Sequence, residues 1–420
     1  MVNRKLRKSL LVLCSSSTVA YYDFFIMVLL APYLSKAFFP NSTSNTSIFT
    51  IYAASTIFMP IGSIVWGHFA DKYGRKSCLI SSYSLIILST LLIAVIPGRQ
   101  YLGQWGALLL FVFRSLQGFA LGGDTAISAT LVAESSSDSN RTLNIGAWLG
   151  ATCLGTLLAT STTWLLMKQA PYPIMITWGW RIPFLLGGVA MIILLMLRGF
   201  IAESPISFNN ANETKSWPIL VIIQSYIPAI ITGVCLELLS SYLIGFVTYV
   251  PTYLNNLHNL STKSANFSLL YGLLLLIFLY PLSGLLADKY GKQKILSIFA
   301  ISSILLGPLS LVLLNSNNLT SIITAILTLK VLTSATTSSA LCQNIENFPP
   351  EIRVSAVGII NSICIGLIAL VPLSSHFLTE ILQDIYAPAY LLVICAAITC
   401  LTILTSRDKS AETQLLSSKN

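Results

Sequence analysis

Charge is scarce in this chain of 420 residues: Asp, Glu, Lys and Arg make up only 9% of it, while 55% of the residues are hydrophobic. Soluble domains carry about 25% charged residues, so this composition excludes an ordinary soluble protein. The sequence also lacks a G-x-x-x-x-G-K-[ST] phosphate-binding loop, which argues against an ATP-driven pump. Each charge within an apolar stretch is therefore a candidate functional residue.

Residues that bind metals or form disulfides are also few. The chain has three histidines and eight scattered cysteines, with no Cys-x-x-Cys pair and no Cys/His cluster. This pattern indicates neither a metal site nor a disulfide framework. We predict a protein that is not an enzyme and that needs no cofactor and no metal.

Long apolar runs dominate the rest of the chain, and about 20 residues suffice to cross a bilayer. The fold class predicted is an all-α integral membrane protein with about 12 transmembrane helices in two pseudo-symmetric halves. The predicted spans are residues 10–35, 48–70, 79–97, 104–132, 142–167, 180–201, 218–254, 265–287, 294–314, 318–341, 354–380 and 387–406.

The net charge of +9 could indicate a nucleic-acid partner, but the distribution of the charges argues otherwise. Most Lys and Arg residues, Arg75 and Arg198 among them, fall in segments that share one side if the N-terminus is cytoplasmic. The positive-inside rule then places both termini in the cytoplasm. We predict a lipid bilayer and no nucleic acid as partners.

A charged turn occurs twice. GHFADKYGRKSCL begins at Gly67 and GLLADKYGKQKIL begins at Gly284, an offset of 217 residues (284 − 67). Such repetition predicts two six-helix halves. The predicted parts are residues 1–201, a cytoplasmic linker 202–217, residues 218–406 and a cytoplasmic tail 407–420.

The chemistry of this turn suits a gate between helices. Gly67 follows Ser63 by four residues, a spacing that lets helix backbones approach closely. Asp71 is a good acceptor for the free amides of a helix start. Gly74 permits a sharp reversal with positive φ, and Arg75 is expected to hold the loop in the cytoplasm.

A second repeat places Glu134 seven residues before Arg141 and Glu346 seven residues before Arg353. We predict that these groups form ion-pair networks that bias a two-state gate, the alternative being independent surface pairs of little energetic value. The predicted gating residues are Gly67, Asp71, Gly74, Arg75, Glu134, Arg141, Glu203, Gly284, Asp288, Gly291, Lys292, Glu346 and Arg353.

Among the charges inside predicted spans, three are candidates for proton coupling: Asp23 in the first span, and Arg114 and Asp124 in the fourth. Arg114 and Asp124 are about 15 Å apart along one helix and cannot pair, so Asp23 is the partner predicted for Arg114. Burial raises the pKa of a carboxyl and a nearby cation lowers it, so a helix movement that changes either one changes its protonation. We predict Asp23 as the proton carrier and Asp124 as the competing candidate.

Several stretches together resemble the metabolite:proton symporters of the major facilitator superfamily. They are Tyr22-Asp23-Phe24, Arg114-Ser-Leu-Gln-Gly118, Gly122-Gly123-Asp124, Gly179-Trp-Arg-Ile-Pro-Phe184, Glu203-Ser-Pro205 and the set Glu346, Phe348, Pro349 and Arg353. TYVPTYL at 248–254 looks most like the proline/betaine transporters. The resemblance spans residues 20–380.

This resemblance implies import of a small zwitterion, such as proline or glycine betaine, with protons by alternating access. It also implies a monomer in a bacterial inner membrane. Aromatic rings suit a quaternary ammonium, and Arg114 or Lys330 suits a carboxylate. The predicted cavity residues are Tyr21, Tyr22, Gln117, Trp148, Glu237, Tyr242, Tyr249 and Lys330.

The chain departs from the family pattern in three places. Ala20-Tyr21 stands where the family has Glu-Trp, Asp124 stands where it has Glu, and the short segment after the last span argues against regulation by a long coiled-coil tail. An organic-acid:proton symporter and a non-transporting membrane sensor stay open as alternatives. A drug/proton antiporter is disfavoured, because GAWLGATCLG from Gly146 lacks the Gly-Pro of efflux members.

Overall fold

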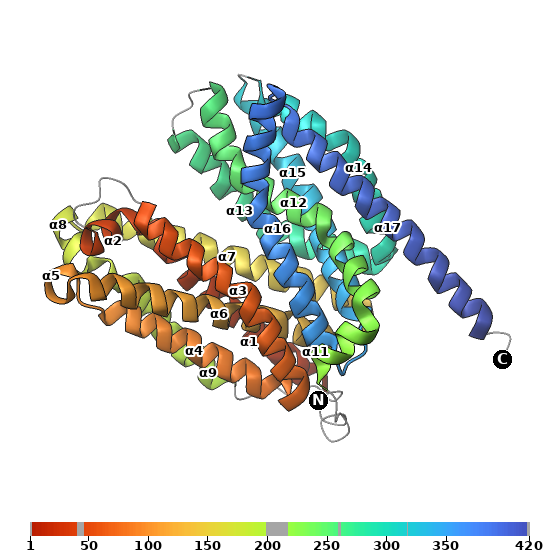
Figure 1. Ribbon diagram of the computed structural model, residues 1–420, viewed down its shortest axis with the longest axis horizontal. Coiled ribbons are helices and arrows are strands. Elements are labelled where there is room, and N and C mark those ends of the chain that lie inside the picture. Colours follow the sequence, from red (N-terminus) through yellow and green to blue (C-terminus); the bar gives the residue numbers. More distant parts are fainter. Residues whose placement is uncertain (1, 40–45, 199–216, 259–261, 317, 418–420) are drawn as a thin grey trace. The chain divides into compact units, whose positions relative to one another are not determined.

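The computed structural model describes residues 2–39, 46–198, 217–258, 262–316 and 318–417, and every regular element in this part of the chain is a helix (Figure 1). Twelve helical stretches within it are long and apolar enough to cross a membrane, which confirms the predicted number of spans. Glu203 and nearly all of the predicted linker lie outside the described residues.

The helices are numbered in the order of the chain. The first half contains α1 (Val2–Leu29), α2 (Ala31–Phe38), α3 (Thr46–Tyr73), α4 (Arg75–Val95), α5 (Arg99–Leu102), α6 (Gln104–Glu134), η1 (Asp138–Asn140), α7 (Arg141–Gln169), α8 (Tyr172–Ile174), η2 (Met175–Gly179) and α9 (Arg181–Arg198). The second contains α11 (Pro218–Val221), η3 (Ile222–Tyr226), α12 (Ile227–His258), α13 (Thr262–Tyr290), α14 (Lys292–Leu314), α15 (Leu319–Glu346), α16 (Arg353–Leu382) and α17 (Ala387–Ser417).

The chain divides into two compact units. Unit 1 consists of Met1–Ser137, Ala147–Ser225 and Phe348–Ser362, and unit 2 consists of Asp138–Gly146, Tyr226–Asn347 and Ile363–Asn420. Apart from α11 and most of η3, which belong to unit 1, each unit therefore contains one short segment from the opposite half of the sequence. That segment is the start of α16 in unit 1 and the start of α7 in unit 2, and both starts matter for the candidate site.

Glycines set the closest helix contact in unit 1, where α3 packs along α6. A Cβ atom on Gly118 would lie 2.0 Å from the Ser55 carbonyl oxygen, and one on Gly122 would lie 2.0 Å from that of Met59. Only residues without a side chain fit at such distances, and the two glycines are four residues apart, a spacing that allows close helix contact. The contact holds α6, which carries Arg114 and Asp124, firmly against α3.

Proline breaks the first predicted span. We predicted one helix over 10–35, but α1 ends at Leu29 and α2 begins at Ala31, with Pro32 in its first turn. Proline is tolerated at a helix start but cannot continue the hydrogen-bond ladder of a preceding helix. Asp23 therefore lies nearer the end of its helix than the apolar run alone suggested.

The two repeated turns share one backbone conformation. Gly74 has φ of 100° and Gly291 has φ of 97°. L-residues with a side chain rarely adopt this region, so glycine is required at both reversals. The prediction of a positive φ at Gly74 is confirmed, and its repeat has the same geometry.

Candidate functional site

Asp23 lies at the centre of a buried polar cluster in unit 1, with none of its surface exposed. Thr90 on α4 donates a hydrogen bond to Asp23 Oδ2 at 2.8 Å. Gln117 on α6 donates from Nε2 to the same oxygen and also contacts Thr90 Oγ1 at 2.8 Å. Two neutral side chains therefore hold one carboxylate oxygen, while Oδ1 has no hydrogen-bond partner.

Arg114 does not pair with Asp23 directly, so the predicted ion pair is wrong in this state. Arg114 donates to Gln117 Oε1 and, at 3.1 Å, to the carbonyl oxygen of Phe24. Its guanidinium carbon lies 5.1 Å from the Phe24 ring centroid and 5.8 Å from that of Tyr52. Gln117, three residues along α6, stands between the two charges and links them through its amide.

Asp124 has the cation that Asp23 lacks. Arg198 at the end of α9 contacts Asp124 Oδ1 at 2.5 Å, and both side chains are nearly inaccessible. Arg198 also donates to the Leu79 carbonyl oxygen at 3.1 Å, and its guanidinium carbon lies 3.7 Å from the Tyr83 ring centroid. Arg198, which the sequence counted among the charges on the cytoplasmic side, is therefore the buried partner of Asp124.

The aromatic residues predicted to line a cavity are mostly packed. Trp148 donates to Ser17 at 2.8 Å and is 2% exposed. In unit 1 the Tyr22 hydroxyl contacts the Pro183 carbonyl oxygen at 3.4 Å, and in unit 2 Tyr242 donates to that of Pro388 at 2.6 Å. Tyr21 keeps part of its surface accessible. Their predicted role in substrate binding stays a prediction.

Lys330 and Tyr249 belong to unit 2, where both are 5% exposed. A Cβ atom on Gly272 of α13 would lie 2.6 Å from Lys330 Cε, so the aliphatic part of the lysine fills the space beside that glycine. Tyr249 packs against the ring of Tyr253, with centroids 6.2 Å apart. The predicted cavity position of Lys330 also stays a prediction.

The first repeated turn binds the start of α16 within unit 1. Asp71 accepts hydrogen bonds from the backbone amides of Val354 at 3.2 Å and Ser355 at 2.7 Å, and from the Ser355 hydroxyl at 2.7 Å. The predicted role of Asp71 as an acceptor for helix-start amides thus has a target 283 residues away in sequence. A carboxylate at a helix N-terminus also interacts favourably with the helix dipole.

Charged side chains complete this first cluster. Arg75 lies 3.9 Å from Asp71, forms an ion pair with Glu134, and donates to the Pro350 carbonyl oxygen at 2.8 Å. Arg353 contacts Glu134 at 2.6 Å. Arg75 is only 1% exposed. It is therefore a buried member of this ion-pair network.

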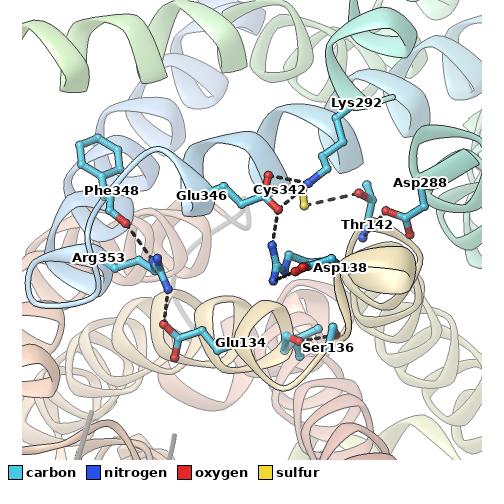
Figure 2. Close-up of polar contacts among 12 residues, drawn as sticks. Glu134, Ser136, Asp138, Thr142, Asp288, Lys292, Cys342, Glu346, Phe348 and Arg353 are labelled. Atoms are coloured by element: carbon cyan, nitrogen blue, oxygen red, sulfur yellow. Dashed lines mark hydrogen bonds and ion pairs between the residues drawn. The ribbon is translucent and has the colours of Figure 1, made fainter. Parts of the chain in front are cut away.

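The second repeated turn binds the start of α7 within unit 2. Asp288 accepts from the amides of Thr142 at 3.0 Å and Leu143 at 2.8 Å. Figure 2 shows the Glu346 carboxylate holding Lys292, and the same carboxylate pairs with Arg141 at 2.5 Å. Asp138, with a 93% exposed side chain, adds a second acid to Arg141 at 2.5 Å.

The two clusters repeat the same roles. In each, an aspartate caps a helix start, and a basic residue four positions later pairs with a glutamate that also holds an arginine. The first cluster is the more buried: the Glu134 side chain is 4% exposed, against 29% for Glu346. Charges in the first cluster are therefore less screened by water and more strongly coupled.

Both repeated glycines touch the helix start that their aspartate caps. A Cβ atom on Gly67 would lie 3.0 Å from the Val354 carbonyl oxygen, and one on Gly284 would lie 2.3 Å from that of Thr142. At Gly67 the small-residue spacing thus brings two backbones together, as predicted. Any larger side chain at either position pushes the helix start away from the carboxylate.

Sequence reasoning missed the polar partners that carry no charge. Thr90 and Ser355 complete the Asp23 and Asp71 contacts, and Asn344 donates to Glu237 at 2.9 Å. Ser, Thr and Asn are frequent throughout the chain, so composition alone does not distinguish these three. Arg198 had a signal: Asp124 is a buried acid that required a cation.

Comparison with known proteins agrees with this architecture. The Major Facilitator Superfamily profile matches residues 13–372. The chain is 27% identical to the glycine betaine/proline/ectoine/pipecolic acid transporter OusA of Dickeya dadantii, over 96% of this chain and 84% of that protein. It is 31% identical to a putative proline/betaine transporter of Staphylococcus haemolyticus, over 92% of this chain and 84% of the relative.

Solved structures share the fold. The proton:xylose symporter XylE superposes with a TM-score of 0.79 over 96% of this chain and 95% of its own, at 17% identity. The E. coli fucose:proton symporter FucP gives 0.73 over 94% of this chain and 98% of its own, at 13% identity. At these identities the likeness concerns the fold alone.

Proposed function

Because the chain belongs to the major facilitator superfamily, a family of membrane transporters, we propose that it imports a small zwitterion such as proline or glycine betaine together with protons. The names of the relatives support this substrate class. One observation supports proton coupling through Asp23. Asp23 is a fully buried acid with no cation in direct contact, whereas Asp124 is neutralised by Arg198.

This difference selects Asp23 as the proton carrier. Protonating Asp124 would leave the Arg198 cation buried without its counter-charge, which is costly. Protonating Asp23 leaves Arg114 with the Gln117 oxygen, the Phe24 carbonyl oxygen and two aromatic rings. Asp23 can therefore gain and lose a proton without orphaning a cation.

Gln117 couples the protonation state of Asp23 to the contacts of Arg114. Its amide nitrogen donates to Asp23 while its amide oxygen accepts from Arg114. When Asp23 is charged, both contacts favour one orientation of the amide. When Asp23 is protonated, the hydrogen bond from the Gln117 amide nitrogen to Asp23 weakens. The amide is then free to reorient, and Arg114 becomes available to a substrate carboxylate.

We propose the two repeated clusters as the gate on the cytoplasmic side. Each one fastens the start of a helix from the opposite half of the sequence, through Asp71 in unit 1 and Asp288 in unit 2. Releasing these caps in one conformation and restoring them in the other would bias alternating access. We further propose a bacterial plasma membrane location, with both termini in the cytoplasm and a monomeric carrier.

The test uses purified protein in liposomes, supplied with labelled proline, glycine betaine and 2-oxoglutarate. We expect the zwitterions to accumulate under an inward proton gradient. Asp23→Asn should abolish accumulation while keeping exchange between preloaded vesicles and medium. Glu380→Gln, which alters a 67% exposed acid, is the matched control and should behave as wild type.

Three outcomes contradict parts of this proposal. Uptake of 2-oxoglutarate alone would replace the substrate class with organic acids. An absence of counterflow for every compound would indicate a sensor that binds without transport. Accumulation by Asp23→Asn with an unchanged response to pH would place the proton carrier elsewhere.

A further inference from the structure

Glu237 on α12 is a further acid within a membrane span, and it belongs to unit 2. Asn344 on α15 donates from Nδ2 to Glu237 Oε1 at 2.9 Å and to the Gly233 carbonyl oxygen at 3.0 Å. The Cys364 thiol on α16 also hydrogen-bonds to the Glu237 side chain. Asn344 and Cys364 are buried, whereas Glu237 keeps a part of its surface accessible.

Within the part of the chain that the structure describes, no cation forms an ion pair with this carboxyl. Among the ion pairs of the described residues, none includes Glu237. Lys330 lies 14 residues before Asn344 on α15, about 21 Å along the helix, and is too far to pair. Glu346, two residues beyond Asn344, lies roughly 200° around the helix and holds Lys292 and Arg141 instead.

A carboxylate at membrane depth, without a cation and with one amide and one thiol as donors, is poorly compensated. A protonated carboxyl in the same place satisfies both donors without a net charge. We propose that Glu237 binds a proton in this state and releases it in another, as a second proton site in the second half of the chain. Its role in transport rests on the function proposed above, but its protonation does not.

Repetition within the chain supports the inference. Glu237 follows Asp23 by 214 residues (237 − 23), close to the 217 that separates the repeated turns. Each acid lies on the first long helix of its half, and each accepts from a carboxamide, Gln117 or Asn344. The second carboxamide, Asn344, lies two residues before Glu346 on α15, so the site stands one helical turn or less from the residue that holds Lys292 and Arg141.

Infrared spectroscopy of the full-length protein in liposomes tests the protonation directly. We expect a carbonyl-stretch band of a protonated carboxyl that decreases as the pH is raised. Glu237→Gln should remove that component, and Glu380→Gln should leave it. Glu237→Asp should keep it at a shifted frequency, which separates loss of the acid from loss of the fold.

A pH difference spectrum of Glu237→Gln identical to that of wild type would overturn the inference. So would a band that disappears on adding sodium at constant pH, because the site would then bind a metal cation. Both outcomes are independent of the transported compound. In preparations active for glycine betaine, Glu237→Gln should lower the number of protons carried per substrate, and an unchanged ratio would contradict its role in coupling.

Discussion

Each repeated aspartate caps a helix start in a different unit, so the two caps can be removed separately. Asp71→Asn should loosen the start of α16, where Val354 and Ser355 donate to the carboxylate. Asp288→Asn should loosen the start of α7, where Thr142 and Leu143 donate. Each substitution should leave the other helix start unaffected.

The size of the effect follows from the hydrogen bonds that each substitution weakens or removes. An asparagine keeps one carbonyl acceptor but loses the charge and the second acceptor, and a hydrogen bond to a charged group contributes about 1.5–3 kcal/mol. For Asp71, whose side chain is inaccessible and also binds the Ser355 hydroxyl, we expect a loss of about 2–3 kcal/mol in local stability. Asp288 accepts from two backbone amides and should lose about 1.5 kcal/mol.

Hydrogen–deuterium exchange measures this loss without any knowledge of the substrate. When exchange occurs through local opening, the loss makes the amides of peptide 348–362 exchange about 30- to 150-fold faster in Asp71→Asn. Peptide 138–146 should stay unchanged there and exchange about tenfold faster in Asp288→Asn. Equal acceleration of both peptides in either variant would show general destabilisation and refute the separate caps.

Two further predictions concern close packing and buried charge. Gly67→Leu and Gly284→Leu should abolish uptake while the protein still inserts into the membrane. Gly284→Leu should be at least as severe, because the backbone next to Gly284 is nearer. Normal uptake by both variants would show that these glycines have no part in the gate. Arg198→Met should destabilise the protein by about 3–5 kcal/mol by leaving Asp124 unpaired, and adding Asp124→Asn should restore most of the melting temperature in detergent. An unchanged melting temperature in Arg198→Met alone would contradict the buried pair.

The sequence predicted well those features that depend on local chemistry. Apolar runs give spans because each backbone group in lipid must be paired within its own helix. Gly74 and Gly291 have the expected positive φ because a side chain is excluded there. The spacing of Gly118 and Gly122 marks a helix contact for the same steric reason.

The contacts of the charged side chains were harder to predict than the helices themselves. Counting Arg75 and Arg198 as cytoplasmic charges follows the positive-inside rule, which concerns the side of the membrane and says nothing of pairing. Both guanidiniums are in fact buried beside acids from other helices. For Arg114, the sequence indicated Asp23 as the neighbouring acid, but whether Gln117 would stand between the two depends on side-chain packing that no periodicity encodes.

The seven-residue repeats illustrate this limit most clearly, and they yield a last prediction. Glu134 and Arg141 are neighbours in sequence, yet Glu134 contacts Arg353 of unit 1, whereas Arg141 contacts Glu346 of unit 2. Each repeat thus supplies its acid to one unit and its arginine to the other. In double-mutant cycles on stability in detergent, Glu134→Gln and Arg353→Gln should couple by about 0.5–3 kcal/mol. Glu134→Gln and Arg141→Gln should be close to additive, and equal coupling in both cycles would show that sequence neighbours pair after all.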